Sequence, residues 1–211
     1  MDAGLDLPVW LREVEQHFGG LYKTRRGKVS PHDPRGQSVA HRGTMRGGDR
    51  MGHHGYAEAY AGVLSGLLGR DDLTIVELGI LGGSGLALWC HLFPTARVIG
   101  LDVDLDHFRS NEAGLRARGA FQRNAPQVYE FDELAHGHLI GDILRGRRID
   151  VMIDDALHDS ASIMQAMREF MPYLAEGGVY IVEDNATVHE DIRRLYPGKR
   201  VESHGELTVI T

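Results

Sequence analysis

The stretch Thr74-Ile-Val-Glu-Leu-Gly-Ile-Leu-Gly-Gly-Ser-Gly85 decides the expected fold. It passes from an apolar run of strand character through a glycine-rich turn into helix-forming sequence. The glycines allow a tight turn and let a ligand approach the main chain. The start of the following helix offers free N–H groups and a dipole that favours an anion such as a carboxylate. The stretch therefore predicts a strand, a ligand-binding loop and a helix.

The sequence after this stretch alternates between short apolar runs and helical stretches. Strands are expected at residues 74–78, 97–101, 128–131, 151–153 and 179–182, with a last edge strand at 206–211. Helices are expected at residues 85–93, 105–118, 133–145 and 160–174. Such alternation predicts an α/β fold, Rossmann-like and doubly wound, with a mainly parallel sheet and helices on both faces.

The sequence before residue 58 is expected to form an N-terminal helical arm. Asp6 can cap a helix over residues 6–18, and a second helix is expected over 58–68. Between them, residues 19–52 are rich in Gly, Arg and His and lack large apolar anchors. We expect this segment to be mobile without ligand and to become ordered over a cofactor or in a subunit contact. The predicted division is 1–57 for helix and arm or lid, and 58–211 for the ligand-binding domain.

Composition limits the classes of function. The chain has 211 residues and a formal net charge of −7, which argues against nucleic-acid binding. Its one cysteine cannot form an internal disulfide, which favours a reducing compartment. No run approaches the roughly 20 apolar residues of a membrane span, and the N-terminus is unlike a signal peptide. We therefore expect a cytoplasmic protein without a membrane partner. The subunit number, including a homo-oligomer, stays open.

The glycine loop does not match the dinucleotide fingerprint G-x-G-x-x-G. Read from Gly79, the third position is Leu81, and read from Gly83, the sixth is Leu88. Instead, Glu77 stands two residues before Gly79, in a pattern that resembles the first motif of class I methyltransferases, which use S-adenosylmethionine (SAM). That resemblance implies that Glu77 and the loop, with Gly79, Gly83 and Ser84, hold the methionine end of SAM.

Two further acids belong to the expected cofactor site. Asp102 ends the second strand, roughly 20 residues past the loop, where an acid bonds ribose hydroxyls. Asp132 follows the third strand and either faces the adenine side or caps the next helix. Asp142 is a weaker candidate for the adenine position because its neighbours place it within a helix.

Acidic residues also follow the fourth and fifth strands. The fourth ends in Asp154 and Asp155, with His158 after them, and the fifth ends in Glu183 and Asp184. Neighbouring strands lie about 4.8 Å apart, so these carboxylates should converge. They would repel one another unless a cation lies between them, and no cationic side chain stands beside them in sequence. Oxygen ligands suit Mg²⁺ best, and Ca²⁺ or Mn²⁺ otherwise.

Together these segments, with His54-Gly-Tyr56, resemble the metal-dependent sugar O-methyltransferases of antibiotic biosynthesis, of the macrocin and mycinamicin type, over about residues 51–185. The resemblance implies that Asp155, Glu183 and Asp184 bind the metal ion and that His158 is the general base. The implied acceptor is a sugar or aminocyclitol hydroxyl of a bacterial natural product. The chain departs from the family in its arm and in being short after the fifth strand, which leaves the acceptor undefined.

Several alternatives stay open. Asp154 is either a supporting residue or, with a register shift of one, the true ligand. His53, His54 and Tyr56 either cover the cofactor or form an ordinary turn. N-methylation of an amino sugar and a non-catalytic SAM-binding module are the rival functions. A family offshoot named cephalosporin hydroxylase shares the carboxylates, but the chain has no two-histidine-one-carboxylate triad for iron chemistry.

Overall fold

The computed structural model describes residues 6–20, 23–24, 32 and 45–211. Its main feature is a seven-stranded sheet in the order β5-β4-β3-β6-β7-β9-β8. The strands are β3 (Thr74–Leu78), β4 (Arg97–Asp102), β5 (Gln127–Glu130), β6 (Ile149–Asp154), β7 (Leu174–Val182), β8 (Val201–His204) and β9 (Leu207–Ile210). The first five pair in parallel, whereas β9 is antiparallel to both β7 and β8. The predicted α/β class is confirmed.

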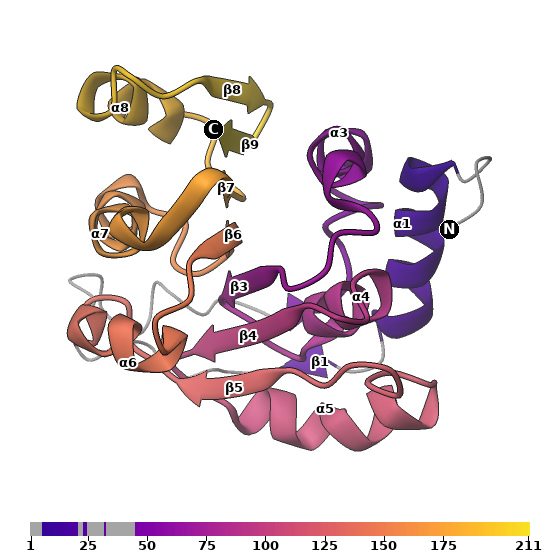
Figure 1. The fold of residues 1–211 in the computed structure, drawn as a ribbon. Helices are drawn as coiled ribbons and strands as arrows, with labels where there is room; N and C mark the ends of the chain where they lie inside the picture. Colours follow the sequence, from indigo (N-terminus) through magenta and orange to yellow (C-terminus); the bar gives the residue numbers. More distant parts are fainter. Residues whose placement is uncertain (1–5, 21–22, 25–31, 33–44) are drawn as a thin grey trace.

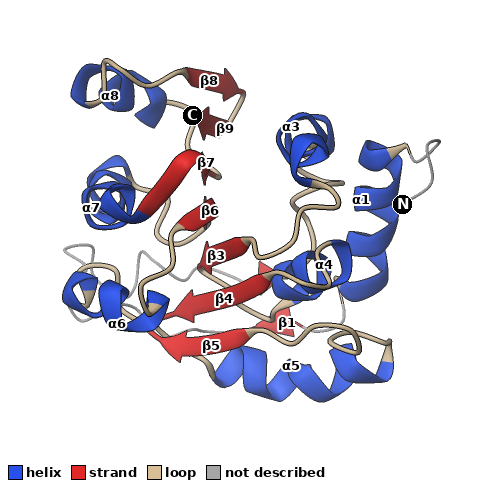
Figure 2. Cartoon of the chain, in the orientation of Figure 1, coloured by secondary structure: helices blue, strands red, loops and turns tan. Residues whose placement is uncertain are grey.

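Helices cover both faces of the sheet (Figures 1 and 2). On one side lie α1 (Leu7–Phe18), α3 (Ala57–Leu64) with η1 (Ser65–Leu67), α4 (Ser84–Leu92) and α5 (Asp106–Ala117). On the other lie η2 (Gly137–Leu139), α6 (Ile140–Leu144), α7 (Ser160–Phe170) with η3 (Met171–Tyr173), and α8 (Val188–Leu195). A separate two-stranded ladder joins β1 (Lys23–Thr24) to β2 (Met45–Arg46).

Alternation along each strand divides the core in two. In β3, Ile75 belongs to the core under α1, α3, α4 and α5, whereas Val76 belongs to the core under α6, α7 and α8. Strands with apolar residues on both faces are typical of a parallel sheet covered on both sides. Within the described part of the chain, no helix combines the length and apolar character that a bilayer crossing requires.

The sheet order places the ends of β3, β6 and β7 next to one another. The chain leaves β3 for β4 on one side and returns to β6 on the other, so the order reverses between β3 and β6. Leu78 pairs with Asp154, and Asp154 pairs with Val182. The residues that follow these three therefore line up at one edge of the sheet, where α/β proteins bind ligands.

The N-terminal helix is part of the main core. α1 is capped by the Asp6 side chain, which accepts the Val9 N–H at 3.2 Å, as predicted. Its buried residues Leu7, Leu11 and Phe18 join the core that also holds α3 and α4. Much of the expected arm, residues 21–22, 25–31 and 33–44, lies outside the described residues. Met51, near its end, is fully buried, so the expectation that residues 19–52 lack apolar anchors is wrong there.

Several predicted elements have different bounds. The helix expected over 133–145 begins only at η2, because Asp132 and His136 close a turn over residues 132–136. The helix expected over 160–174 ends as η3, and β7 starts at Leu174. The strand expected at the edge, residues 206–211, is β9, and it lies between β7 and β8. α8 and β8 were not predicted.

Candidate functional site

The glycine loop after β3 is held by Asp102 at the end of β4. One Asp102 oxygen accepts the N–H groups of Ile80 and Leu81, both at 2.9 Å, and the other accepts the Asp104 N–H at 2.9 Å. Burial raises the pKa of Asp102, and the backbone donors oppose that rise. Asp102 therefore organises the loop in this structure, and a role toward ribose would be additional.

The glycines of the loop serve close packing as well as turning. Gly79 has φ of +85°, and a Cβ there would collide with the Asp155 backbone. Gly83 has φ of +80° and is the N-cap of α4, which begins at the buried Ser84. A Cβ on Gly83 would collide with the Phe108 ring. The loop is therefore pressed against the end of β6, next to the acidic residues.

The other expected cofactor residues lie in different surroundings. Asp132 is 5% exposed, and its carboxylate accepts the Leu134 N–H at 3.0 Å within the turn over 132–136. It caps this turn rather than an α-helix, since the expected helix does not begin there. Asp142 is an exposed residue of α6. Glu77 is 2% exposed and points toward an arginine from outside the sheet.

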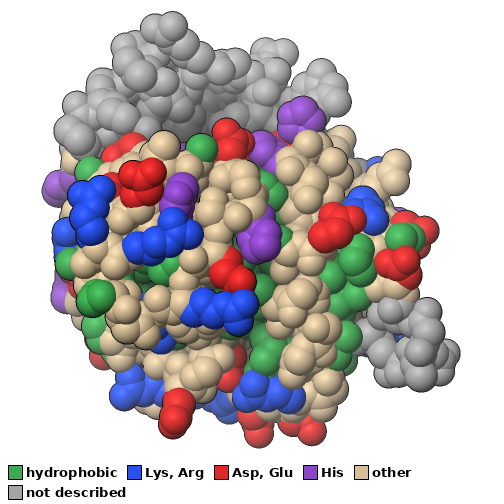
Figure 3. Space-filling view, turned by 90° about the horizontal axis from the view of Figure 1, so that it is seen from above, with side chains coloured by type: hydrophobic (Ala, Val, Ile, Leu, Met, Phe, Trp, Pro, Cys, Tyr) green, Lys and Arg blue, Asp and Glu red, His purple; other side chains and the backbone are tan. Residues whose placement is uncertain are grey.

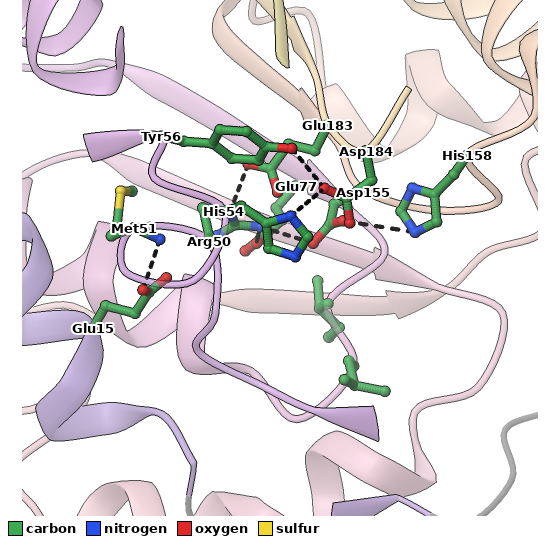
Figure 4. A network of polar contacts seen from close by, with 12 residues as sticks. Glu15, Arg50, Met51, His54, Tyr56, Glu77, Asp155, His158, Glu183 and Asp184 are labelled. Carbon is green, nitrogen blue, oxygen red and sulfur yellow. Dashed lines mark hydrogen bonds and ion pairs between the residues drawn. The ribbon is translucent and has the colours of Figure 1, made fainter. Parts of the chain in front are cut away.

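That arginine is Arg50, which comes from the expected arm. Its Nη2 donates to Glu77 Oε1 at 2.7 Å and to Asp155 Oδ2 at 3.0 Å, and its Nε lies 2.6 Å from Glu183 Oε1 (Figure 4). Burial alone would lower the pKa of Arg50, but the carboxylates of Glu183 and Glu77 raise it, so the guanidinium stays charged. No cationic side chain stands beside the strand-end carboxylates in sequence, but the fold brings Arg50 to them from a distant segment.

Glu183 faces the interior of the site. Its side chain is 2% exposed, and Oε1 meets both Arg50 and the hydroxyl group of Tyr60. Burial strongly raises the pKa of that tyrosine, and Glu183 adds to the rise, so Tyr60 stays protonated and donates to the carboxylate. Glu183 is thus placed by a helix residue and a loop residue from outside the strands. We call Arg50, Tyr60, Glu77, Asp155 and Glu183 the Arg50 network.

Asp155, His158 and Asp184 form a second, more open group. Ligand atoms of these three side chains lie within 4.8 Å of one another, a spacing that suits a single metal ion. Asp155 Oδ1 lies 3.9 Å from His158 Nε2, and the side chains are 27–34% exposed. Two carboxylates and an imidazole are suitable ligands for a divalent cation. In Figure 4, His158 lies on the far side of Asp155 from Arg50.

Electrostatics in this group also suit a cation. Burial raises the pKa of Asp155 well above its ordinary value, Glu183 adds to the rise, and Arg50 opposes it. A nearby dication would favour the charged carboxylate and reverse that shift. Asp154 lies on the other side of the strand, 3% exposed and hydrogen-bonded to the Tyr180 hydroxyl at 3.0 Å. Asp155, and not Asp154, therefore faces the open group in this structure.

The backbone at this group is unusual. His158 and Asp184 both have φ of +57°, in the left-handed region that few non-glycine residues occupy. Asn185 holds the two loops together, because its amide nitrogen donates to the His158 carbonyl at 2.8 Å while its oxygen accepts the Val188 N–H that begins α8. Non-glycine residues in this conformation concentrate at functional sites.

The residues before α3 complete the open side. The Tyr56 hydroxyl donates to Asp184 Oδ1 at 2.8 Å, and His54 Nδ1 lies 3.3 Å from the same oxygen. The backbone of residues 49–56 forms turns, since the N–H groups of His53 and His54 both bond to the Asp49 carbonyl. The sequence suggested either a cover over the cofactor or an ordinary turn for His53, His54 and Tyr56. Neither interpretation included the contact with Asp184, which lies 128 residues beyond Tyr56 in sequence.

Comparisons with known proteins bear on the family and on the fold. No protein-family model matches the chain. The chain is 30% identical over 148 residues to an 8-demethyl-8-alpha-L-rhamnosyl tetracenomycin-C 2'-O-methyltransferase from Streptomyces olivaceus. The aligned region covers 67% of this chain and 36% of the relative. The chain is also 29% identical over 127 residues to the mycinamicin VI 2''-O-methyltransferase of Micromonospora griseorubida, over 57% of this chain and 29% of the relative. The chain thus spans about a third of the length of these relatives.

A solved structure supports the fold. The MycE methyltransferase from the mycinamycin biosynthetic pathway, in complex with Mg and SAH, superposes with a TM-score of 0.58 and 15% identity. The match covers 73% of this chain and 48% of that structure. The chain therefore has the class I methyltransferase fold, and over about two thirds of its length it resembles the sugar O-methyltransferases of antibiotic biosynthesis.

Proposed function

We propose that this chain transfers a methyl group from SAM to a hydroxyl group on a sugar or aminocyclitol of a bacterial natural product, with a divalent cation, Mg²⁺ in the first place. The observation that carries the proposal is the position of Asp155, His158 and Asp184 beside the β3–α4 loop. The named activities of the curated relatives, all O-methyltransferases acting on glycosylated compounds, support the acceptor class.

The proposed cofactor site is the loop and its flanking acids. Glu77, Gly79, Gly83 and Ser84 would bind the methionine end of SAM, where the start of α4 offers N–H groups to its carboxylate. Asp102 would bind the ribose hydroxyls, and Asp132 the adenine side. The approach of the Gly79 backbone to Asp155 would bring the sulfonium methyl group next to the acidic residues.

The proposed metal ligands are Asp155, Glu183 and Asp184. Asp155 and Asp184 already have ligand atoms within 4.8 Å of one another. Glu183 Oε1 is held by Arg50 and Tyr60, so Glu183 would offer its other carboxylate oxygen to the ion. A bound divalent cation would lower the pKa of the acceptor hydroxyl and orient it. A fit to such an ion is supported by the donor set and by the raised pKa of Asp155.

His158 would act as the general base. Its Nε2 faces Asp155 Oδ1, so this nitrogen points to the region where an acceptor hydroxyl would lie. His158 Nε2 would accept the hydroxyl proton as the acceptor oxygen takes the methyl group from the sulfonium, which would leave S-adenosylhomocysteine (SAH). Alignment of oxygen, carbon and sulfur would supply much of the rate increase.

The acceptor is expected to be a small molecule rather than a nucleic acid. The formal net charge is −7, which opposes binding to phosphates. On the described part of the face in Figure 3, basic and acidic side chains are interspersed rather than gathered by sign. An acidic protein tolerates neutral or cationic acceptors, and this suits glycosylated antibiotics and aminoglycosides.

The test is a methylation assay with SAM, Mg²⁺ and a panel of glycosylated antibiotics, with the new methyl group located by mass spectrometry and NMR. We expect an O-methyl product that disappears in excess EDTA and returns with added Mg²⁺. In Asp184→Asn, added Mg²⁺ should not restore it. Asp191→Asn, on an exposed helix residue, is the matched control and should behave as wild type. Full activity in EDTA would contradict the metal role and favour N-methylation of an amino sugar. SAM binding without any product would favour the non-catalytic module.

A further inference from the structure

We propose that Arg50 is a positioning residue for the metal-binding carboxylates, and that Glu15 of α1 determines where Arg50 lies. The inference rests on the proposed function, because two of the carboxylates that Arg50 contacts, Asp155 and Glu183, are the proposed metal ligands. It assigns a role to two residues that lie outside the strand-loop motifs of the fold.

Arg50 contacts three carboxylates at once. Its Nη2 bridges Glu77 and Asp155, at 2.7 and 3.0 Å, and its Nε meets Glu183 at 2.6 Å. The side chain is 8% exposed, so these contacts are made away from water. A planar guanidinium presents its N–H groups in a fixed fork, and a lysine ammonium cannot reproduce that geometry. Arg50 therefore fixes three carboxylates relative to one another.

The contact with Asp155 has a directional consequence. Arg50 holds Oδ2, while Oδ1 faces His158 Nε2 at 3.9 Å. The carboxylate is thus turned so that one oxygen belongs to the Arg50 network and the other to the open group with His158 and Asp184. Supporting residues that orient a metal ligand in this way strongly influence metal affinity.

Arg50 does not replace the dication in charge. Three carboxyl groups surround one guanidinium, and Asp184 lies beside Asp155, so a single positive charge does not match the number of acids. The guanidinium carbon lies 5.4 Å from the centre of the Trp89 ring, and the Trp89 N–H donates to Glu77 at 3.2 Å. These contacts hold Arg50 on the side of Asp155 opposite to the open group.

The backbone next to Arg50 is held by α1. Glu15 is 4% exposed, and its Oε2 accepts the N–H groups of Met51 at 2.7 Å and Gly52 at 3.2 Å. Figure 4 shows this bond on the opposite side of the network from His158. Met51 itself is fully buried, so the residue after Arg50 is fixed by both its backbone and its side chain. Helix α1 thus anchors the segment that carries Arg50.

The first experiment measures Mn²⁺ affinity directly, by the loss of the free Mn²⁺ signal in electron paramagnetic resonance, with the purified full chain. Arg50→Lys keeps the positive charge but loses the fork, and we expect Mn²⁺ to bind about 10–100-fold more weakly. The matched control is Arg109→Lys at an exposed helix position, which should bind as wild type. Unchanged or tighter Mn²⁺ binding in Arg50→Lys would overturn the inference, because the guanidinium would then act only as a competing charge.

The second experiment tests the link to α1 with the same measurement. Glu15→Ala removes the acceptor of the two N–H groups and should weaken Mn²⁺ binding, whereas Glu15→Gln keeps an acceptor oxygen and should restore it. Glu13→Gln, two residues away on the exposed face, is the control. If Glu15→Ala lowers only the melting temperature and leaves Mn²⁺ affinity unchanged, Glu15 has a purely structural role and this part is wrong. If Glu15→Ala does not fold, Glu15→Asp, which withdraws the carboxylate by one methylene group, takes its place, and Mn²⁺ affinity equal to wild type in that variant would contradict this part.

These outcomes separate the inference from the function on which it rests. A wild-type protein that binds SAH but not Mn²⁺ contradicts the metal-dependent function. A wild-type protein that binds Mn²⁺, with variants of equal affinity, contradicts only the role given to Arg50 and Glu15.

Discussion

The two halves of the candidate site are built in different ways. In the cofactor half, the Asp102 carboxylate is satisfied by backbone N–H groups of the adjoining loop and of its own turn. In the carboxylate half, Asp155 and Glu183 are satisfied by Arg50, from a segment before the first strand of the main sheet. The first half is organised by its own loops, whereas the second depends on the docking of residues 49–56. A change in that segment should therefore reach the proposed metal ligands and spare the loop.

The largest effect on turnover is expected from His158, the proposed general base in the carboxylate half. His158→Gln removes the proton acceptor, so turnover with SAM and Mg²⁺ should fall by about 10²–10⁴-fold. SAH affinity, measured by calorimetry, should stay as in wild type, because the polar contacts described for His158 go to Asp155 and Asn185. His138→Gln at an exposed position is the control. A parallel loss of SAH affinity would mean that the two halves are not independent.

The corresponding change in the cofactor half is Asp102→Asn. It keeps the shape but removes the charge that accepts three backbone N–H groups. Hydrogen bonds to charged groups contribute about 1.5–3 kcal/mol, so SAH should bind roughly 10–100-fold more weakly. Mn²⁺ affinity should not change. Asp106→Asn on the exposed start of α5 is the matched control, and equal SAH affinity in Asp102→Asn and wild type would remove Asp102 from the site.

A smaller effect is expected at Glu133, which is 6% exposed and has other acids as neighbours. Burial raises the pKa of Glu133 to about 7, and the neighbouring acids Asp154, Asp132 and Asp102 add to the rise. Because the folded-state pKa lies above the unfolded one, the folded protein holds this proton longer. Its contribution to stability is therefore full at low pH and is lost as pH rises through about 7.

Glu133→Gln should remove this dependence. From pH 5 to pH 8, the free energy of unfolding of the variant should gain roughly 2 kcal/mol relative to wild type, since one pKa unit corresponds to about 1.4 kcal/mol. Urea denaturation at the two pH values measures it, with the exposed Glu176→Gln as control. A constant difference between variant and wild type would show that Glu133 titrates normally.

The same contrast explains what the sequence could reveal. The strand, the glycine turn and Asp102 lie within about thirty residues and follow local rules of periodicity and turn formation, so the fold class and the loop were predictable. Arg50 has its partners 27 and 105 residues away, in Glu77 and Asp155. Within a segment rich in arginine, nothing local distinguishes it from Arg42 or Arg46. Its place depends on tertiary packing.

The missed elements have related causes. α8 has a regular apolar spacing, with Val188, Ile192 and Leu195 at i, i+4 and i+7, but it is only 8 residues long and buries only the first two. β8 is a short polar strand with no fully buried residue. The helix expected over 133–145 was extended too far because the turn at Asp132 depends on a contact between its N–H and the His136 ring. Asp155, Glu183 and Asp184 could be singled out in the sequence because they directly follow apolar strands, and His158 because it comes three residues after Asp155.

The left-handed backbone at His158 and Asp184 has a consequence for selection. A non-glycine residue in such a conformation costs of order 1 kcal/mol or more, so glycine at either position would relieve strain. Glycine would also remove the imidazole or the carboxylate. A laboratory screen for thermal stability alone would therefore enrich substitutions at these two positions while discarding catalysis, and persistence of His and Asp there in active variants would measure how strongly function opposes stability.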